Sequence, residues 1–314
     1  MLDRFGREIT YLRLSVTELC DLRCRYCMPE EGICKVPRER LLTEEEMVRA
    51  VEAAAALGVR KLRITGGEPL VKPNILSLVR RCAAAPGIQE VCLTTNGLGL
   101  GELARPLREA GVERVNISLD TLEREKYAYM TRRDRLDDAL AGLEAALEAG
   151  FRQVKVNVVL IGGFNDDEIP ALAELTRRRP VDVRFIELMP MGGDFPPGAY
   201  LPCGAVLERL PQLEAEAAQG TARLYRLPGA LGRVGLISPV SAHFCARCDR
   251  LRLTADGKLK PCLHGEAELS IKGLDRAGME EAIRRAILAK PECHAPLSSA
   301  QPSRAGRAMH RIGG

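Results

Sequence analysis

Strand-like and helix-like segments alternate over the first 191 of the 314 residues, and this alternation limits the possible folds more than any other feature. The sequence predicts six strands, near residues 10–17, 60–66, 89–96, 113–119, 153–160 and 181–188, with Ala-, Leu- and Glu-rich helices between them. The first helix opens at Thr43 with a capping box through Glu46, and Gly58 ends it. Such alternation predicts parallel strands with right-handed crossovers, in a (β/α) barrel or an open doubly wound sheet.

The polarity pattern within the strands separates these two folds. A parallel sheet covered on both faces has continuous apolar strands, whereas here alternate positions are polar or basic. Because successive side chains of a strand point to opposite faces, each strand has one apolar and one polar face. We therefore expect an α/β fold with a partial (β/α)6 barrel, open along one side, whose polar faces line a lumen that includes Arg13, Lys61, Arg63, Lys155 and Arg184.

Five cationic side chains in one lumen require a bound anion. Two like charges ~4 Å apart repel each other by roughly 4 kcal/mol at an effective dielectric constant near 20. Closed eight-stranded barrels fill their interiors with branched side chains, so a polar lumen predicts a polyanionic ligand. The alternative interpretation places some of the five cations at strand ends in water, paired with Asp182 or Glu187.

The composition changes at Met189–Gly198, where proline and glycine are dense enough to break regular structure. We place a domain boundary there, with the barrel over residues 1–191 and a smaller α+β region over residues 192–314 that closes the open side. This second region is predicted to contain a helix near 203–210, short strands between 221 and 262, a helix near 276–289 and an irregular tail.

Charge and cysteine content exclude several classes of protein. The 46 basic and 42 acidic residues leave a net charge of +4, which is too small by itself to imply a nucleic-acid partner. No run approaches the ~18 apolar residues of a membrane span, and no signal-like apolar region opens the chain, so we expect a cytoplasmic protein. Eleven cysteines, an odd number with several at ligand spacing, indicate metal binding in a reducing compartment rather than disulfides.

The loop after the first strand carries Cys20, Cys24 and Cys27 in a C-x3-C-x2-C pattern. Three thiolates are one ligand short of a closed tetrahedral site, which leaves a position for a substrate or cofactor. A zinc site, or an electron-transfer cluster with a distant fourth cysteine, would use the same residues. With Tyr26 before the last cysteine, the pattern resembles that of radical S-adenosylmethionine (SAM) enzymes. The resemblance implies that the cysteines hold a 4Fe-4S cluster whose free iron is chelated by SAM.

Gly66-Gly67-Glu68-Pro69 follows the second strand, at the end where a βα fold places its ligands. Paired glycines let a ligand approach the backbone closely, and Glu68 can order the loop. Alone, the two glycines would indicate a plain turn. The radical SAM resemblance implies that this segment holds the amino group of SAM, and that the contacts with SAM come from Tyr26, Gly67, Ser118 and Met189.

A second group of cysteines, Cys245, Cys248 and Cys262, again supplies three thiolates and leaves one position open. A zinc shell here would need a fourth ligand, for which the candidates are Cys203, Cys293, His243 and His264. Arg250 and Arg252 follow at alternate positions, so both can face the site. An open iron beside paired arginines suits a substrate that is both metal-binding and anionic.

The whole chain resembles the GTP 3',8-cyclase family of molybdenum cofactor biosynthesis. The segments that carry this resemblance are Asp3-Arg4-Phe5-Gly6-Arg7, Tyr11-Leu12-Arg13-Leu14-Ser15, Arg63-Ile64-Thr65-Gly66-Gly67-Glu68-Pro69, Asn116-Ile117-Ser118-Leu119-Asp120, Phe185-Ile186-Glu187-Leu188-Met189-Pro190-Met191-Gly192, Phe244-Cys245 through Cys262, and the tail from Arg307 to Gly314. Two departures are Asp249, where many relatives have Asn, and Cys293-His294-Ala295-Pro296-Leu297, which lacks an expected aromatic residue.

The resemblance implies a lyase that uses two 4Fe-4S clusters and SAM. The cluster on Cys20, Cys24 and Cys27 would reduce SAM to a 5'-deoxyadenosyl radical, which removes the 3' hydrogen of GTP so that the ribose carbon attacks C8 of guanine. The product would be (8S)-3',8-cyclo-7,8-dihydroguanosine 5'-triphosphate. The cluster on Cys245, Cys248 and Cys262 would bind guanine. The residues implied to hold the rest of GTP are Arg13, Lys61, Arg63, Thr94, Lys155, Arg184, Arg250 and Arg252.

The tail and the partners are also implied by this resemblance. Gly313 and Gly314 would reach into the active site, and Arg307 would aid the reaction, although a frayed terminus is the alternative. The implied partners are GTP, a reductant such as a flavodoxin or ferredoxin, the cyclic pyranopterin monophosphate synthase that acts downstream, and possibly a second copy of the chain, with no nucleic acid or membrane.

Two other functions use the same motifs. A radical SAM peptide-modifying enzyme with an auxiliary cluster would not need a cavity with five cations. A non-catalytic, metal-stapled nucleic-acid binder would carry its basic residues on an exposed surface and would contain zinc without acid-labile sulfide. The position of the basic residues therefore distinguishes all three interpretations.

Overall fold

The computed structural model describes residues 1–33, 35–191, 198–298 and 300–313. Its strands are β1 (Tyr11–Ser15), β2 (Lys61–Thr65), β3 (Glu90–Thr95), β4 (Val112–Ser118), β5 (Gln153–Leu160), β6 (Val181–Glu187), β7 (Glu214–Gln219), β8 (Ala222–Arg226), β9 (Val234–Ile237), β10 (Arg250–Leu253), β11 (Lys258–Lys260) and β12 (Leu269–Ser270). Its helices are α1 (Glu44–Ala56), α2 (Ile75–Ala83), α3 (Leu100–Glu109), α4 (Arg124–Thr131), α5 (Leu136–Glu148), α6 (Ile169–Arg178), α7 (Gly204–Arg209) and α8 (Arg276–Leu288).

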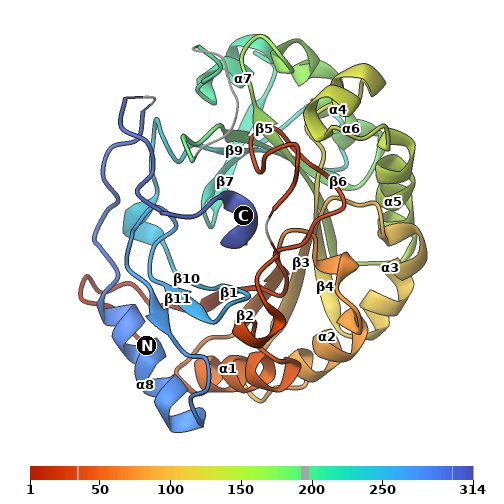
Figure 1. Cartoon of the computed structure of the whole chain (residues 1–314). Helices are drawn as coiled ribbons and strands as arrows, with labels where there is room; N and C mark the ends of the chain where they lie inside the picture. The colour runs from red at the N-terminus through yellow and green to blue at the C-terminus, as the bar shows by residue number, and fades with distance from the viewer. Residues whose placement is uncertain (34, 192–197, 299, 314) are drawn as a thin grey trace.

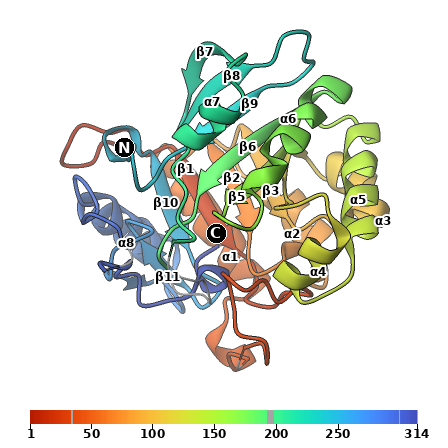
Figure 2. The same cartoon turned by 90° about the horizontal axis from the view of Figure 1, so that it is seen from above.

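The six predicted strands form the centre of one curved sheet, in the order β1 to β6, all parallel. The helices α1 to α6 lie on the outside of this curve (Figures 1 and 2). The strands within the described residues run from β12 at one edge to β7 at the other without the two edges pairing. The predicted partial barrel is therefore confirmed.

Strands of the second half of the chain extend both edges of the barrel. β10 pairs with β1 and β9 pairs with β6, in both cases parallel, and antiparallel strands follow on each side. Since one sheet continues across the position of the predicted domain boundary, the division near residue 191 stays a prediction. Part of the predicted linker, residues 192–197, lies outside the described residues.

Local signals fix the element ends much as predicted. Thr43 Oγ1 accepts from Glu46 N at 3.2 Å and Glu46 Oε2 accepts from Thr43 N at 2.8 Å, which is the predicted capping box. Gly58, with φ +97°, follows the end of α1. β7 was not predicted because Glu214–Gln219 has no β-branched residue, and its pairing with β8 makes it an edge strand.

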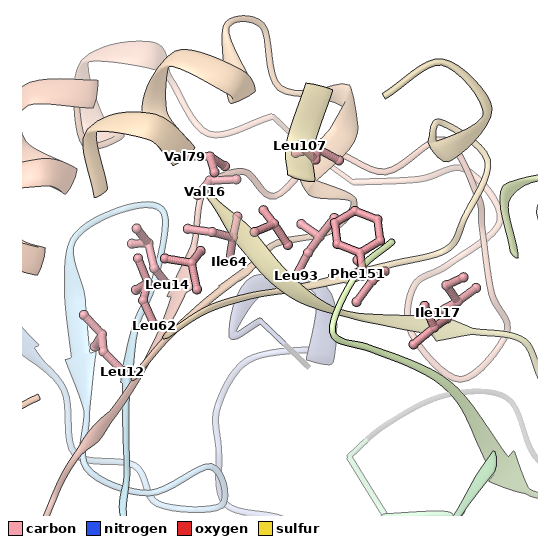
Figure 3. Close-up of a cluster of buried hydrophobic side chains, with 14 of the residues drawn as sticks. Leu12, Leu14, Val16, Leu62, Ile64, Val79, Leu93, Leu107, Ile117 and Phe151 are labelled. Atoms are coloured by element: carbon pink, nitrogen blue, oxygen red, sulfur yellow. The ribbon is translucent and has the colours of Figure 1, made fainter. Parts of the chain in front are cut away.

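The apolar faces of the strands pack against the outer helices and leave the polar faces for the lumen. Figure 3 shows this layer, in which Leu12, Leu14, Leu62, Ile64 and Leu93 have at most 1% of their surface exposed. None of the helices in the described part of the chain has the length and apolarity that crossing a bilayer requires.

We expect Gly142→Ala to destabilise the barrel. A Cβ at Gly142, in the middle of α5, would lie 2.1 Å from the carbonyl oxygen of Gly97, so α5 could no longer lie so close to the segment that precedes α3. Overpacking of this kind costs about 1–3 kcal/mol. Urea unfolding followed by circular dichroism should show a lower midpoint for this variant.

Gly101→Ala is the matched control for that measurement. Gly101 is also helical, but a Cβ there has no neighbour within 4 Å. The higher helix propensity of alanine should leave the midpoint unchanged or raise it, by up to about 1 kcal/mol in free energy of unfolding. Equal midpoints for the two variants would contradict the close helix contact at Gly142.

Candidate active site

The lumen contains a cavity of about 440 Å³. Neighbouring strands place its residues side by side, because Tyr11 is in register with Lys61 and Arg250, and Arg13 with Arg63 and Arg252. All the basic residues that the sequence predicted to bind substrate line this cavity, together with Thr94: Arg13, Lys61, Arg63, Lys155, Arg184, Arg250 and Arg252. These seven cations therefore lie inside the fold. A nucleic-acid-binding protein would instead carry them on an exposed surface.

Burial and mutual repulsion lower the pKa of several of these groups. Burial lowers the pKa of Lys155 to about 6, with a further contribution from Arg184. Burial likewise lowers the pKa of Arg252 to about 10, with Arg250 as the nearest repelling charge. An anion in the cavity would reverse these shifts, since an opposite charge favours the protonated forms.

Several buried polar atoms of the cavity lack a hydrogen-bond partner. They are Nε of Arg184, Nε of Arg250, Oδ1 of Asn116 and Oδ1 of Asn157. Buried polar atoms are nearly always paired, so unpaired donors and acceptors on one cavity wall indicate a polar ligand. The donors among them are the charged type that binds phosphate most strongly.

Lys61, in the cavity wall, has a carboxylate partner. Its Nζ lies 2.6 Å from Glu90 Oε1. Burial would raise the pKa of Glu90, but the hydrogen bond from Lys61 and the charges of Lys61 and Arg114 lower it to about 2. The acids that the sequence offered as counter-ions are used elsewhere: Asp182 pairs with Arg233, and Glu187 accepts from the backbone of residues 203, 240 and 241.

Tyr11 is a cavity residue to which the sequence analysis gave no role. Its hydroxyl accepts a hydrogen bond from Arg63 Nε, and the Lys61 ammonium and the Arg250 guanidinium lie 5.1 Å and 5.7 Å from its ring centroid. Burial would raise the pKa of Tyr11, but the charges of Arg63 and Arg13 lower it to about 8. The sequence could have indicated this position, because Tyr11 lies on the same strand face as Arg13.

The first cysteine loop is fixed by its backbone, which leaves the thiols for a ligand. Arg23 N and Arg25 N donate to the carbonyls of Thr131 and Met130, at 2.9 and 3.0 Å. Burial raises the pKa of the Cys20 and Cys27 thiols to about 12. These thiols therefore need a bound positive centre to become thiolates.

A smaller cavity beside Cys24 is lined by Tyr26 and Ser118, two of the predicted SAM contacts. Tyr26 OH donates to Asp120 Oδ2 at 2.8 Å. Met189, another predicted SAM contact, lines the large cavity instead. The structure thus brings Tyr26 and Ser118 together beside the first cysteine loop, while their contact with SAM stays a prediction.

The Gly-Gly-Glu-Pro segment hydrogen-bonds the backbone that leads into the first cysteine loop. Gly67 N donates to Thr17 O at 2.8 Å and Glu68 N to Leu19 O at 2.7 Å. The Glu68 carboxylate orders the segment, as predicted, by accepting from Leu70 N, Thr95 Oγ1 and Asn96 N at 2.6–2.9 Å. Burial raises the pKa of Glu68 to about 7, although these hydrogen bonds lower it.

The second cysteine group lies in the wall of the large cavity, where Cys245, Cys248 and Cys262 face the same space as the cations. Arg7, which the sequence analysis left without a role, holds this group. Its Nη1 donates to the carbonyls of Cys245 and Glu292 at 2.8 and 2.9 Å, and Nη2 donates to Pro291 O at 2.7 Å. Asp3 Oδ2, 2.6 Å from Arg7 Nε, orients the guanidinium.

Each trio offers three thiols, which suits a 4Fe-4S cluster because the thiolates bind separate irons and leave the fourth iron open. Four-coordinate zinc keeps its ligand atoms about 3.5–3.8 Å apart, given bonds of about 2.3 Å to sulfur and 2.0–2.1 Å to nitrogen. Among the described residues, His243, Cys245 and Cys293 have ligand atoms that all lie within 4.8 Å of one another.

One of the candidates for a fourth zinc ligand lies away from the second trio. Cys203 is fully buried, with its Sγ 3.6 Å from Phe185 O and 3.4 Å from Ile237 O. His264 lines the cavity with the trio, and its Nδ1 lies 3.0 Å from Ser303 Oγ, which leaves Nε2 available. The structure brings the other two candidates, His243 and Cys293, to the rim of the second trio.

The tail enters the centre of the barrel, where Figure 1 shows the end of the chain. The carbonyl of Gly313 accepts from Arg13 Nη2 at 3.1 Å and from Arg252 Nη1 at 2.7 Å. Arg307 pairs with Asp256 and Glu268 at 2.9 and 2.6 Å and is not among the residues that line the cavity. Its catalytic role stays a prediction, and Gly314 lies outside the described residues.

Fold and site together define a radical SAM protein. Residues 14–176 match the Radical SAM superfamily, and residues 181–296 match the family described as Molybdenum Cofactor Synthesis C. Over 330 residues, the chain is 48% identical to the GTP 3',8-cyclase of Moorella thermoacetica, with 100% of both chains covered. The GTP 3',8-cyclase of Listeria monocytogenes is 42% identical, with 93% of this chain and 91% of the relative covered. The chain therefore belongs to the GTP 3',8-cyclase family.

Solved structures support the fold independently. Streptococcus suis SuiB bound to S-adenosylmethionine matches with a TM-score of 0.59 and 15% identity, covering 84% of this chain and 63% of that one. Methylornithine synthase matches with a TM-score of 0.52 and 20% identity, covering 66% of this chain and 63% of that one. At these identities the similarity establishes the shared barrel only.

We expect Gly67→Ala to impair the first cysteine site selectively. A Cβ at Gly67 would lie 2.3 Å from Leu19 O and would push the backbone that leads into Cys20. After anaerobic iron–sulfur reconstitution, iron per chain should fall from about eight toward about four, because only one 4Fe-4S cluster remains. Reductive cleavage of SAM should be lost. Gly204→Ala, where a Cβ has no neighbour within 4 Å, is the control and should retain both clusters.

Arg7→Lys should have the complementary effect on the second site. A lysine keeps the charge opposite Asp3 but cannot reach the carbonyls of Cys245, Pro291 and Glu292 together, since it lacks the planar fork of arginine. Iron should again fall toward about four per chain, whereas cleavage of SAM without substrate should persist. The exposed neighbour Arg4→Lys serves as control. Loss of SAM cleavage in Arg7→Lys would contradict the assignment of Arg7 to the second site alone.

Proposed function

We propose that this chain converts GTP to (8S)-3',8-cyclo-7,8-dihydroguanosine 5'-triphosphate in molybdenum cofactor biosynthesis, as a lyase of the radical SAM type. The observation that carries the proposal is the cavity that combines a cysteine trio with a wall of cations. A nucleoside triphosphate is the ligand that uses both features, because its base can bind a metal centre and its phosphates carry several negative charges.

The cations of the cavity bind the triphosphate. The residues that do so are Arg13, Lys61, Arg63, Lys155, Arg184, Arg250 and Arg252, with the Thr94 hydroxyl as a further contact. Lys155, whose pKa burial and Arg184 lower to about 6, takes up a proton when the polyanion enters. Glu90 offsets part of the positive charge of Lys61.

Cys20, Cys24 and Cys27 hold the first 4Fe-4S cluster, and Tyr26, Gly67, Ser118 and Met189 contact SAM. When bound, this pair would supply a 5'-deoxyadenosyl radical for removal of the 3' hydrogen of GTP, and the bond from that ribose carbon to C8 of guanine would be completed by one further electron, from the reductant, and one proton. The chain's own contribution is placement: Glu68 fixes the Gly-Gly segment, and Asp120 fixes Tyr26 through its hydroxyl. Burial of both sites keeps water from the reacting atoms.

Cys245, Cys248 and Cys262 hold the second cluster, whose open position binds guanine. The tail lies against the same space, since Gly313 contacts Arg13 and Arg252. We assign Gly313, Gly314 and Arg307 to the reaction on this basis, with Arg307 acting through the tail that it anchors. A small reductant such as flavodoxin or ferredoxin supplies electrons, and cyclic pyranopterin monophosphate synthase consumes the product.

The proposed function is tested by GTP-dependent cleavage of SAM. The chain is reconstituted anaerobically with iron and sulfide and incubated with SAM, dithionite and GTP, and 5'-deoxyadenosine is quantified. We expect about eight irons per chain and strong stimulation by GTP. ATP, which has the same phosphates but another base, should stimulate far less. No stimulation by GTP over the nucleotide-free control would overturn the proposal.

Tyr11 makes GTP binding dependent on pH. Its pKa of about 8 means that the empty site carries a phenolate above that pH. This phenolate neutralises part of the charge that the triphosphate needs, so GTP binds the neutral phenol better. The affinity should fall as pH rises through 8, by up to about tenfold per pH unit for one linked proton.

Tyr11→Phe should abolish this component of the pH dependence. The phenyl ring retains the contacts with Lys61 and Arg250 but has no proton to lose. Equilibrium binding of GTP to both proteins between pH 7 and 9 gives the comparison, since ionisation of GTP itself is common to the two. Parallel pH profiles would show that Tyr11 stays protonated.

A further inference from the structure

A second set of metal-ligand side chains lies at the rim of the second cysteine trio. A ring nitrogen of His243, the Cys245 thiol and the Cys293 thiol lie within 4.8 Å of one another. Cys293 Sγ is 3.7 Å from His243 Nε2. Two segments contribute these residues, the turn that leads into Cys245 and the turn that follows α8.

His294 lies beside this group and can supply a fourth ligand through Nε2, because its Nδ1 lies 2.8 Å from the carbonyl oxygen of Ala295. Its ring contacts the His243 ring edge to face, with the centroids 5.5 Å apart. Two thiolates and two imidazoles are a common ligand set of structural zinc. The ligand atoms of His243, Cys245 and Cys293 already lie within 4.8 Å of one another, and the His294 ring must turn toward them to complete a tetrahedral shell.

The backbone that carries these ligands is already held together. One guanidinium nitrogen, Arg7 Nη1, donates both to Cys245 O at 2.8 Å and to Glu292 O at 2.9 Å, the residue before Cys293. His243 and Cys293 are exposed, whereas Cys245 and His294 also line the large cavity. A metal ion can therefore approach from solvent and still reach Cys245.

We propose that, in the absence of the second iron–sulfur cluster, His243, Cys245, Cys293 and His294 bind one Zn²⁺ ion. Because Cys245 is needed by both, zinc and the second cluster exclude each other. Neither Cys248 nor Cys262 takes part. Binding displaces the thiol protons of Cys245 and Cys293, as metal binding to thiols does, and involves no change of oxidation state. The concentration of free zinc thus sets the fraction of protein molecules that carry both clusters.

The first test is zinc binding to the cluster-free full chain, kept reduced and anaerobic. Zn²⁺ is titrated in competition with a chromophoric chelator, and Co²⁺ serves as the spectroscopic probe of thiolate ligands. Removal of a ligand should weaken binding at least as much as removal of an outer-shell partner, about 10–100-fold. We expect this loss for Cys293→Ser, together with a weaker thiolate-to-cobalt band.

Cys248→Ser is the matched control, because it removes a cluster ligand and leaves the proposed zinc ligands intact. It should bind zinc as the wild type does. Zinc held elsewhere, for example by the first trio, is common to all variants and cancels in the comparison. Equal weakening by Cys248→Ser and Cys293→Ser would place zinc on the cluster trio and overturn the proposal, as would unchanged affinity in Cys293→Ser.

The second test measures exclusion directly. The chain is loaded with one equivalent of Zn²⁺ and then reconstituted with iron and sulfide. The wild type should reach about four irons per chain, and Cys293→Ser about eight. About eight irons in the zinc-loaded wild type would refute the exclusion. Because these tests measure metal content only, they do not depend on whether the chain cyclises GTP.

Discussion

The concentration of buried positive charge in the lumen is the constraint on which the rest of the structure depends. Arg13, Arg63 and Arg252 each have less than 10% of their surface exposed, yet they lie on neighbouring strands. Two like charges ~4 Å apart repel each other by roughly 4 kcal/mol at an effective dielectric constant near 20. Neutral acceptors help to offset this repulsion, among them the carbonyl of Gly313 for Arg13 and Arg252 and the hydroxyl of Tyr11 for Arg63.

The alternation of residues within each strand builds the cavity and the core at the same time. Leu12 and Leu14 pack outward against the helices (Figure 3). Arg13, between them in the sequence, lines the cavity in the lumen. A shift of one residue in register would exchange the two faces, so the apolar layer also fixes the position of every cation. The parallel pairing of β10 with β1 places Arg250 and Arg252 beside Tyr11 and Arg13, which lie more than 200 residues earlier in the chain.

Local sequence patterns were sufficient to predict the barrel and the composition of its site. The six strands, the capping box of Thr43 and Glu46 and the two cysteine trios all depend on residues close together in the chain. Local patterns could not predict contacts between segments that are distant in the sequence. Arg7 and Cys245 are 238 residues apart, and the choice of Glu90 over Asp182 as the partner in the lumen depends on strand register.

The two cysteine sites are stabilised by different parts of the chain, so a substitution can affect one site without the other. The first is held by its own neighbourhood, through Glu68 and the backbone of residues 130 and 131. The second depends on the N-terminal Arg7 and on the segment after α8. The tail contacts the first cysteine site and the lumen, because His310 Nδ1 lies 2.9 Å from Cys27 O while Gly313 O accepts from Arg13 and Arg252. One short segment of the chain thus supplies both a contact with the loop of Cys27 and an acceptor for the buried cations.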